Sequence, residues 1–325
     1  MTTTMTAEQA GRFADVVERL AENVSHAVQG KPHVVRLALV TLLTGGHLLL
    51  EDAPGTGKTS LARALAQSVR STTSRIQFTP DLLPGDITGV SVLDQGTGRF
   101  VFHPGPVFAS IVLADEINRA SPKTQSALLE VMEEGRVTVD GVSHPVGEPF
   151  LVVATQNPIE QAGTHRLPEA QLDRFLIKTS IGYPDHATTL RILESAAEPP
   201  HSDPLPSIVT PEGVLLLMAE ARTVHVEAAV NDYVSRLVQA TRDAPETRLG
   251  ASVRAALGLV RAAKTYAASS GRHYVVPDDV KALAVPVLAH RLVLDPEAEF
   301  DGATSEGVVA RALLDVAPPG GVAQA

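Results

Sequence analysis

The chain opens with a helical pattern of apolar side chains. Phe13, Val17, Leu20, Val24 and Val28 recur at intervals of three and four residues, which places them on one face of a helix. The pattern predicts an amphipathic helix at the start of the chain.

A second helical pattern covers about 32–44 and stops at Gly45-Gly46. The next residues, "HLLLE" at 47–51, are a short continuous apolar run, typical of a buried parallel strand. A Gly-rich loop follows, and then a helical stretch from about Lys58 to Val69. Strand, loop and helix in this order form the context that a phosphate-binding loop requires.

The loop sequence "EDAPGTGKTS" has the residues for binding phosphates. Gly55 and Gly57 let backbone N–H groups turn toward one point, and the positive end of the following helix attracts anions. Lys58 can reach the β and γ phosphates, and the Thr59 hydroxyl can ligate Mg²⁺. The strict pattern has a glycine where this chain has Asp52, but that position precedes the cradle and does not block it. The alternative is an ordinary strand-to-helix turn.

We therefore predict that this loop binds a nucleotide. The predicted nucleotide-binding residues are Asp52, Ala53, Pro54, Gly55, Thr56, Gly57, Lys58, Thr59 and Ser60.

A second motif, "SIVLADEINRA" at 110–120, is an apolar run that ends in two acids. Asp115 and Glu116 should lie at the carboxyl end of a strand, the edge where ligands bind in open α/β sheets. Successive side chains of a strand point in different directions. We therefore predict that Asp115 holds Mg²⁺ while Glu116 deprotonates an attacking water. The alternative is a solvated strand end capped by acids.

A third apolar run, "FLVVATQNP", ends in Asn157. This side chain could hydrogen-bond the attacking water or the γ-phosphate. It could equally be a turn residue before Pro158, and the sequence leaves both readings open.

Two hairpins are predicted beside these motifs. Residues 89–106 and 136–146 each have two short strand patterns around a Gly-containing turn. Between them, Ser121 as cap, Pro122 at the first helical position and Gly135 as stop predict a helix.

The stretch 196–211 contains five prolines, so no helix can run through it. Beyond it, helices are expected at about 211–222, 227–242, 250–268 and 277–290. We therefore predict three parts. Residues 1–198 are a nucleotide-binding core with N-terminal helices and two inserted hairpins, 199–210 are a linker, and 211–325 are a helical lid with a flexible tail.

The composition of the chain excludes several classes of site and partner. The 325 residues are 44% hydrophobic, enough for a core, and contain no cysteine, which excludes disulfides and thiolate metal sites. A net charge of −10 with 4% aromatic residues argues against a nucleic-acid partner. No apolar run is long enough to span a membrane and no export signal is apparent, so we expect a soluble, cytoplasmic protein without membrane insertion. The eleven histidines have no metal-ligand spacing, which leaves Mg²⁺ as the expected metal.

The motifs "EDAPGTGKT", "LADEINRA", "ATQNP", "LPEAQLDRF" and "GASVRAAL", in this order, resemble the MoxR family of AAA+ ATPases from about residue 8 to 315. The resemblance implies an α/β fold: a P-loop NTPase (AAA+) three-layer core with a parallel sheet, followed by a small all-α lid domain. It also implies the site roles: Walker A for Lys58 and Thr59, Walker B for Asp115 and Glu116, sensor 1 for Asn157, the arginine finger for Arg174 and sensor 2 for Arg254.

The residues alone leave other readings for the two arginines. Arg174 could form a surface salt bridge with Asp173 or Glu169, and Arg254 could point outward from its helix. The chain also departs from the family at two places. Val253 stands where a Pro is usual before the sensor 2 Arg, and His165-Arg166 stand where a Tyr is often found.

The sequence thus predicts a Mg-ATP-hydrolysing AAA+ ATPase. The resemblance implies a homo-oligomer, expected to be a hexameric ring, that acts in a chaperone-like way on a client protein, with a protein that carries a von Willebrand factor A domain as the expected type of partner. The alternatives are a magnesium-chelatase-like or nucleic-acid motor ATPase, and a slow nucleotide-gated binding switch.

Overall fold

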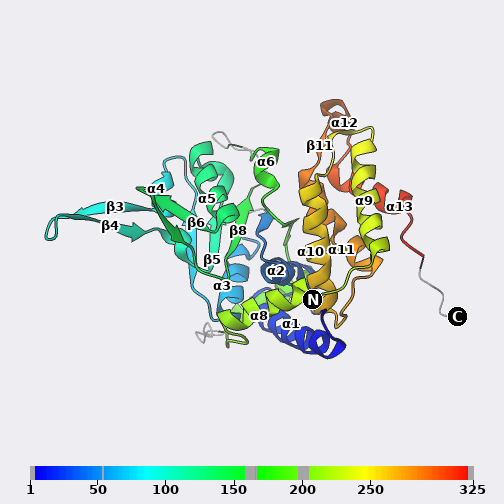
Figure 1. Cartoon of the computed structure of the whole chain (residues 1–325), viewed down its shortest axis with the longest axis horizontal. Coiled ribbons are helices and arrows are strands. Elements are labelled where there is room, and N and C mark those ends of the chain that lie inside the picture. The colour runs from blue at the N-terminus through cyan, green and yellow to red at the C-terminus, as the bar shows by residue number, and fades with distance from the viewer. Residues whose placement is uncertain (1–3, 53–54, 158–164, 166, 197–204, 321–325) are drawn as a thin grey trace. The chain divides into compact units, whose positions relative to one another are not determined.

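A computed structural model describes residues 4–52, 55–157, 165, 167–196 and 205–320 (Figure 1). The chain forms two compact units, and each is described by itself. The core unit comprises Glu18–Leu167 and Thr179–Leu215, and the C-terminal unit comprises Met1–Val17, Pro168–Lys178 and Leu216–Ala325.

The core unit is built on a five-stranded sheet with the order β2-β5-β8-β1-β9. Its strands are β1 (Leu48–Glu51), β2 (Thr73–Gln77), β5 (Ile111–Asp115), β8 (Leu151–Gln156) and β9 (Ile177–Thr179), of which β9 begins in the C-terminal unit and ends in the core unit. The pairings β1/β8, β5/β8 and β2/β5 are all parallel. Strands β1, β5 and β8 lie at the apolar runs, as predicted, and are almost wholly buried. Strand β2 was not predicted, because its residues are mostly polar and only Ile76 is buried.

The strand register brings polar residues into one row at the carboxyl edge of this sheet. Gln77 pairs with Asp115 across β2 and β5, and Ala114 pairs with Ala154 across β5 and β8. Thr155, one residue after Ala154, therefore lies beside Asp115. This edge is where a parallel α/β sheet binds its ligands.

The predicted N-terminal helices are confirmed as α1 (Ala7–Ala27), α2 (Pro32–Thr44) and α3 (Lys58–Ser68). The five apolar residues of the first helical pattern are all buried. Helix α3 packs on β2 and β5, so the loop that precedes it lies near the carboxyl edge.

Both predicted hairpins are present. Strands β3 (Gly89–Asp94) and β4 (Arg99–Pro104) form the hairpin that projects at the left of Figure 1, and β6 (Arg136–Val139) pairs with β7 (Val142–Pro145). At the base of the first hairpin Gly89 has a φ of 93° and a Cβ there would lie 2.3 Å from the His103 carbonyl oxygen, so only glycine fits.

Helix α5 (Pro122–Glu134) lies between the hairpins in the sequence and begins and ends as predicted. The Ser121 side chain accepts a hydrogen bond from the Thr124 N–H at 3.3 Å, and Gly135 is left-handed at the C-terminus. Four further elements of the core unit are the helices α4 (Pro84–Thr88) and α7 (His186–Ala196) and the 3₁₀ turns Pro106–Phe108 and Ile117–Arg119.

The C-terminal unit is mainly helical, as predicted. Its principal helices are α9 (Ala228–Asp243), α10 (Val253–Ser269), α11 (Pro277–Leu288) and α13 (Ser305–Asp315), with short helices α6 (Glu169–Leu172) and α12 (Pro296–Phe300) and a 3₁₀ turn at Ala289–Arg291. Helix α8 (Pro211–Arg222) begins in the core unit and ends in this one. A two-stranded sheet joins β10 (Thr247–Leu249) to β11 (Val293–Leu294).

The α/β class with a parallel sheet is confirmed. The domain limits at 198 and 211 stay a prediction. Half of the predicted linker, residues 199–204, and the last five residues of the predicted tail lie outside the described residues.

Candidate functional site

The loop between β1 and α3 has the backbone of an anion cradle. Gly55 and Gly57 have φ values of 85° and 94°, which side-chain-bearing residues rarely adopt. A Cβ at either position would meet no heavy atom within 4 Å, so the space beside the loop is open. Lys58, Thr59 and Ser60 form the first turn of α3, whose N–H groups have no partner within the helix. These residues fit a bound phosphate group.

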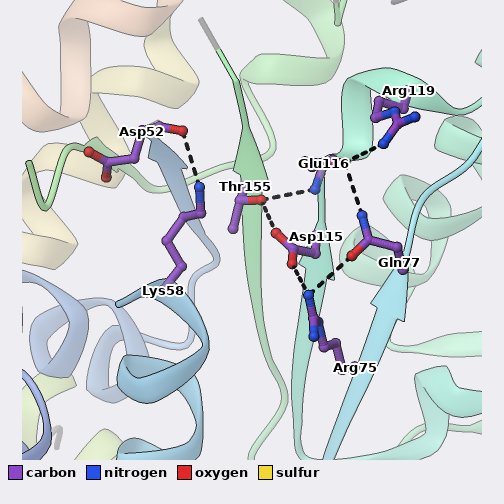
Figure 2. A network of polar contacts seen from close by, with 8 residues as sticks. All are labelled: Asp52, Lys58, Arg75, Gln77, Asp115, Glu116, Arg119 and Thr155. Atoms are coloured by element: carbon purple, nitrogen blue, oxygen red, sulfur yellow. Dashed lines mark hydrogen bonds and ion pairs between the residues drawn. The ribbon is translucent and has the colours of Figure 1, made fainter. Parts of the chain in front are cut away.

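Asp52 connects this loop to a distant segment of the core unit. Its buried carboxylate accepts hydrogen bonds from the Ser180 hydroxyl at 2.8 Å, the Ile181 N–H at 2.6 Å and the Gly182 N–H at 2.8 Å. Its backbone carbonyl accepts a hydrogen bond from Lys58 Nζ at 3.1 Å (Figure 2). The Asp52 side chain is thus hydrogen-bonded to this distant segment. Asp52 contacts the loop through its backbone carbonyl, which accepts from Lys58.

The remaining predicted loop residues differ in exposure. Thr56 is buried, Thr59 is half-buried and Ser60 is exposed. Ala53 and Pro54 lie outside the described residues.

Asp115 lies at the end of β5, as predicted, and both of its carboxylate oxygens have a partner. Oδ1 accepts a hydrogen bond from the Thr155 hydroxyl at 2.6 Å, and Oδ2 accepts one from Arg75 Nη2 at 2.6 Å. Arg75 also donates to the Gln77 side chain at 3.1 Å. Figure 2 shows these groups gathered at the edge of β2, β5 and β8.

Glu116 has a left-handed backbone with φ 57° and ψ 49°, a conformation that costs a non-glycine residue about 1–2 kcal/mol. Three contacts hold it there. Its N–H donates to the Thr155 hydroxyl at 2.9 Å, and its Oε2 accepts hydrogen bonds from Gln77 at 3.0 Å and Arg119 at 2.8 Å. Strained residues that are held in this way are frequent at active sites. The turn also directs the Glu116 side chain away from that of Asp115, as Figure 2 shows.

The residues at this edge fit a divalent cation. Mg²⁺ prefers oxygen ligands and keeps several of its waters, so one or two protein ligands together with phosphate oxygens suffice. Thr59 supplies a hydroxyl and Asp115 a carboxylate, and Asp115 already attracts a positive group, the Arg75 guanidinium. Within the part of the chain that the structure describes, no group of three or more His, Asp or Glu side chains could hold a metal ion without such help.

Asn157 directly follows β8, near the same edge. Its carbonyl accepts a hydrogen bond from the Asn118 side chain at 3.4 Å. Nearby, the Asn118 carbonyl accepts from the N–H of His165 at 2.7 Å. His165 belongs to the His165-Arg166 departure from the family sequence, and Arg166 lies outside the described residues. The role of the Asn157 side chain stays a prediction.

Arg254 belongs to the C-terminal unit, and the local structure explains the "GAS" that precedes it. A Cβ on Gly250 would lie 2.6 Å from Arg242 Cα, so this position must be glycine. Ala251 is buried, and its carbonyl accepts a hydrogen bond from Arg242 Nε at 2.9 Å. Ser252 caps α10 by accepting from the Ala255 N–H at 3.1 Å. Val253 is then the first residue of the helix, the position that proline favours.

Arg174 also belongs to the C-terminal unit and follows the short helix α6. The carboxylate of the preceding residue, Asp173, forms ion pairs with Arg291 at 3.2 Å and Arg254 at 3.7 Å. The structure therefore brings the predicted sensor 2 arginine to the residue before the predicted finger. The loop, Asp115, Glu116 and Asn157 lie in the core unit.

Sequence reasoning missed several polar residues of the site, namely Arg75, Gln77, Arg119, Thr155 and Arg291. Thr155 could have been found from its place near the carboxyl end of the predicted strand β8, and Gln77 from its place at the end of β2, had that strand been recognised. Arg119 follows Glu116 by three residues, a common spacing for local ion pairs. No sequence signal points to Arg75 or Arg291, because the acids that they contact, Asp115 and Asp173, are distant along the chain.

Two buried histidines are structural. Burial lowers the pKa of His47 to about 4 and that of His290 to about 3. His47 accepts a hydrogen bond at Nδ1 from the Val152 N–H at 3.0 Å and contacts the Met132 carbonyl through Nε2 at 3.0 Å. Both rings are therefore neutral at pH 7.

Among the described residues, none of the helices is both long and apolar enough to cross a bilayer.

Comparisons with known proteins show the family of the chain. Residues 47–177 match the model of the "ATPase family associated with various cellular activities (AAA)", and 239–312 match that of the "AAA lid domain". The chain is 46% identical to YeaC, an uncharacterised protein of Bacillus subtilis, over 93% of this chain and 94% of that protein. It is 43% identical to the chaperone MoxR1 of Mycobacterium tuberculosis, over 96% of this chain and 85% of that protein.

A solved structure agrees as well. The fold is similar to that of a crystal structure from Cytophaga hutchinsonii described as a candidate ATPase, with a TM-score of 0.88, 38% identity, and coverage of 95% of this chain and 96% of that chain. A P-loop fold with a parallel sheet, a lid domain and relatives of this similarity over nearly the whole chain lead to one assignment: the chain belongs to the MoxR family of AAA+ ATPases.

Proposed function

We propose that this chain hydrolyses Mg·ATP to ADP and phosphate as one subunit of a homo-oligomeric ring, with six as the expected number of subunits. The observation that carries the proposal is the arrangement of Asp115 and Glu116. Two adjacent acids are held at the carboxyl edge of the sheet by one hydroxyl, that of Thr155, and point apart. This separation allows one acid to serve a cation and the other to serve a water.

The loop residues bind the phosphates in this proposal. The N–H groups that follow Gly55 and Gly57 face the phosphate oxygens, and Lys58, now 3.1 Å from the Asp52 carbonyl, exchanges that neutral partner for the β and γ phosphates. Thr59 and Asp115 would hold Mg²⁺, which supplies charge neutralisation on the phosphate oxygens.

Glu116 is the proposed general base. Gln77 and Arg119 both donate to its Oε2, so we assign the proton transfer to Oε1. These two contacts fix the carboxylate plane, and the Thr155 contact fixes the backbone behind it. A base oriented in this way can take the proton of an attacking water.

The two arginines complete the proposal. Arg254 acts as sensor 2 within its own chain, and Arg174 enters the nucleotide site of a neighbouring subunit, where it stabilises negative charge in the transition state. The resemblance of "LPEAQLDRF" and "GASVRAAL" to the family motifs supports both roles, and Asn157 is the proposed sensor 1.

The proposed task is chaperone-like remodelling or maturation of a client protein, for which a protein with a von Willebrand factor A domain is our first candidate. The relative MoxR1 is named a chaperone. The hairpin β3–β4 exposes large apolar side chains, among them Leu93, Phe100 and Val101, and such patches often contact other proteins. The hairpin is therefore the part of the core unit that we expect to act on the client.

The proposal is tested by the ATPase rate as a function of protein concentration, with and without double- or single-stranded DNA. If subunits share sites, turnover per subunit rises with concentration and then levels off. Turnover that is independent of concentration would contradict the shared site, stimulation by DNA would favour a nucleic-acid motor, and negligible turnover would favour a nucleotide-gated switch.

A further inference from the structure

The backbone on either side of Arg174 is held by one buried cation. Arg291 Nη2 donates to the Phe175 carbonyl at 2.8 Å and lies 3.3 Å from the Asp173 carbonyl. Its Nε lies 3.2 Å from the Asp173 carboxylate. Arg291 thus contacts the residue before Arg174 and the residue after it, and all four residues belong to the C-terminal unit.

Arg291 is a costly group in this position. Only 5% of its side chain is exposed, and burial lowers its pKa to about 10, so it still carries its charge at pH 7. A buried charge requires a partner, and the Asp173 carboxylate is the acid that Arg291 contacts. The neighbouring His290 adds a second contact from Nε2 to the Phe175 carbonyl at 3.0 Å.

Helix α10 leaves room for this cation. Gly258 is buried in the middle of the helix, where glycine costs about 0.5–1 kcal/mol relative to alanine. A Cβ at this position would lie 3.2 Å from Arg291 Nη1 and 3.4 Å from Leu176 Cδ1. The glycine therefore lets the guanidinium and the segment after Arg174 pack closely on α10.

We propose that Arg291 is a positioning residue for Arg174, acting through the carbonyls of Asp173 and Phe175 and through the Asp173 carboxylate. This inference rests on the proposed function, in which Arg174 enters the nucleotide site of a neighbouring subunit. A finger must reach the transferred phosphate with its backbone already fixed, because a small misplacement costs much of its effect. Lysine cannot replace Arg291, since a single ammonium cannot match the planar fork that reaches these three oxygens.

The test uses two full-length proteins that are each defective in a different way. The acceptor is Arg174→Ala, which keeps Glu116 and Arg291 and lacks only the finger. The donor is Glu116→Gln, which has a defective site but an intact finger, and mixing the two should restore turnover at the acceptor's own sites. A donor with Glu116→Gln and Arg291→Lys should restore at least about tenfold less turnover than the Glu116→Gln donor does, because its finger is misplaced.

The matched control donor combines Glu116→Gln with Arg272→Lys. Arg272 forms another arginine–aspartate pair in the same unit, with the buried Asp279, so this donor reports any general effect of weakening the unit. It should restore turnover as well as Glu116→Gln alone does. Thermal unfolding midpoints of all donors show whether each one is folded.

Three outcomes are distinct. If the Arg291→Lys donor restores turnover as fully as Glu116→Gln, the positioning role is overturned while the shared site stands. If Glu116→Gln restores nothing although subunits exchange, the shared site fails, and the positioning role fails with it. If the Arg291→Lys donor does not fold, a donor with Glu116→Gln and Asp173→Asn takes its place, and full restoration by that folded donor overturns the role.

Discussion

The Thr155 hydroxyl donates a hydrogen bond to the Asp115 carboxylate at 2.6 Å. The same oxygen accepts a hydrogen bond from the backbone N–H of Glu116 at 2.9 Å. One fully buried hydroxyl from β8 therefore holds the proposed metal-side acid by its side chain and the proposed base by its backbone.

Thr155→Val should fold but hydrolyse ATP poorly. Valine keeps the shape and removes both hydrogen bonds, and a lost hydrogen bond to a charged group costs about 1.5–3 kcal/mol. If that loss falls on the transition state, turnover drops between about tenfold and a hundredfold. Steady-state kcat with a thermal unfolding midpoint checks this, and Thr155→Ser should restore most of the rate. Wild-type turnover in Thr155→Val would show that the hydroxyl does not organise the site.

Lys58→Ala should lose ATP binding while staying folded, because the lysine supplies the charge that faces the phosphates, while the Asp52 carbonyl that it contacts in the fold is a neutral partner. Equilibrium titration with a fluorescent ATP analogue measures the affinity. Lys123→Ala, which removes an exposed lysine from α5, is the control and should bind as the wild type does. Unchanged affinity in folded Lys58→Ala would refute the loop assignment.

Glu116→Gln should bind Mg·ATP but turn it over about 10²–10⁴ times more slowly, the usual loss when a general base is removed. The amide keeps the size of the side chain and can still accept from Gln77 or Arg119. Binding and single-turnover hydrolysis are measured on the same preparation. A normal rate would mean that another group activates the water.

Arg174→Ala should bind ATP about as well as the wild type but hydrolyse it poorly, since arginine fingers act mainly on the transition state and contribute roughly 10³–10⁵ in rate. Mixed with Glu116→Gln, it should regain activity wherever an intact finger meets an intact base. A purely structural arginine predicts the reverse, with a lower unfolding midpoint, near-normal turnover and no gain on mixing.

Stability should fall as the pH drops from about 6.5 to about 4, in part because of His47. Its pKa is about 4 in the folded protein and about 6.5 when unfolded, so within this window the unfolded chain binds the extra proton. The difference between these two pKa values corresponds to about 3 kcal/mol of stability, which is lost progressively through the window and fully below it. Thermal unfolding at pH 7 and pH 5 checks this. His47→Gln, which has no titrating ring, should show a smaller drop than the wild type, and an equal drop would contradict the assignment.

The sequence by itself determined the local parts of this protein. The α5 helix begins at Ser121 and ends before Gly135 because a side-chain cap and a left-handed glycine act within a few residues of the helix ends. The phosphate loop and the acids that end β5 were likewise predictable, since glycine torsions and the apolar run of a buried strand are properties of short segments.

Only the tertiary structure decided which distant residues complete the site. Asp52 differs from the glycine of the strict loop pattern. The structure explains an acid at this position, because its carboxylate accepts hydrogen bonds from Ser180, Ile181 and Gly182. Thr155 meets Asp115 because of the register between β5 and β8, and register follows from packing across the whole sheet. Arg291 lies against Asp173 because the interior of the C-terminal unit brings together segments that share no local pattern. Local torsions and periodicity depend on residues that are neighbours in the sequence, whereas these pairings exist only once the chain has folded.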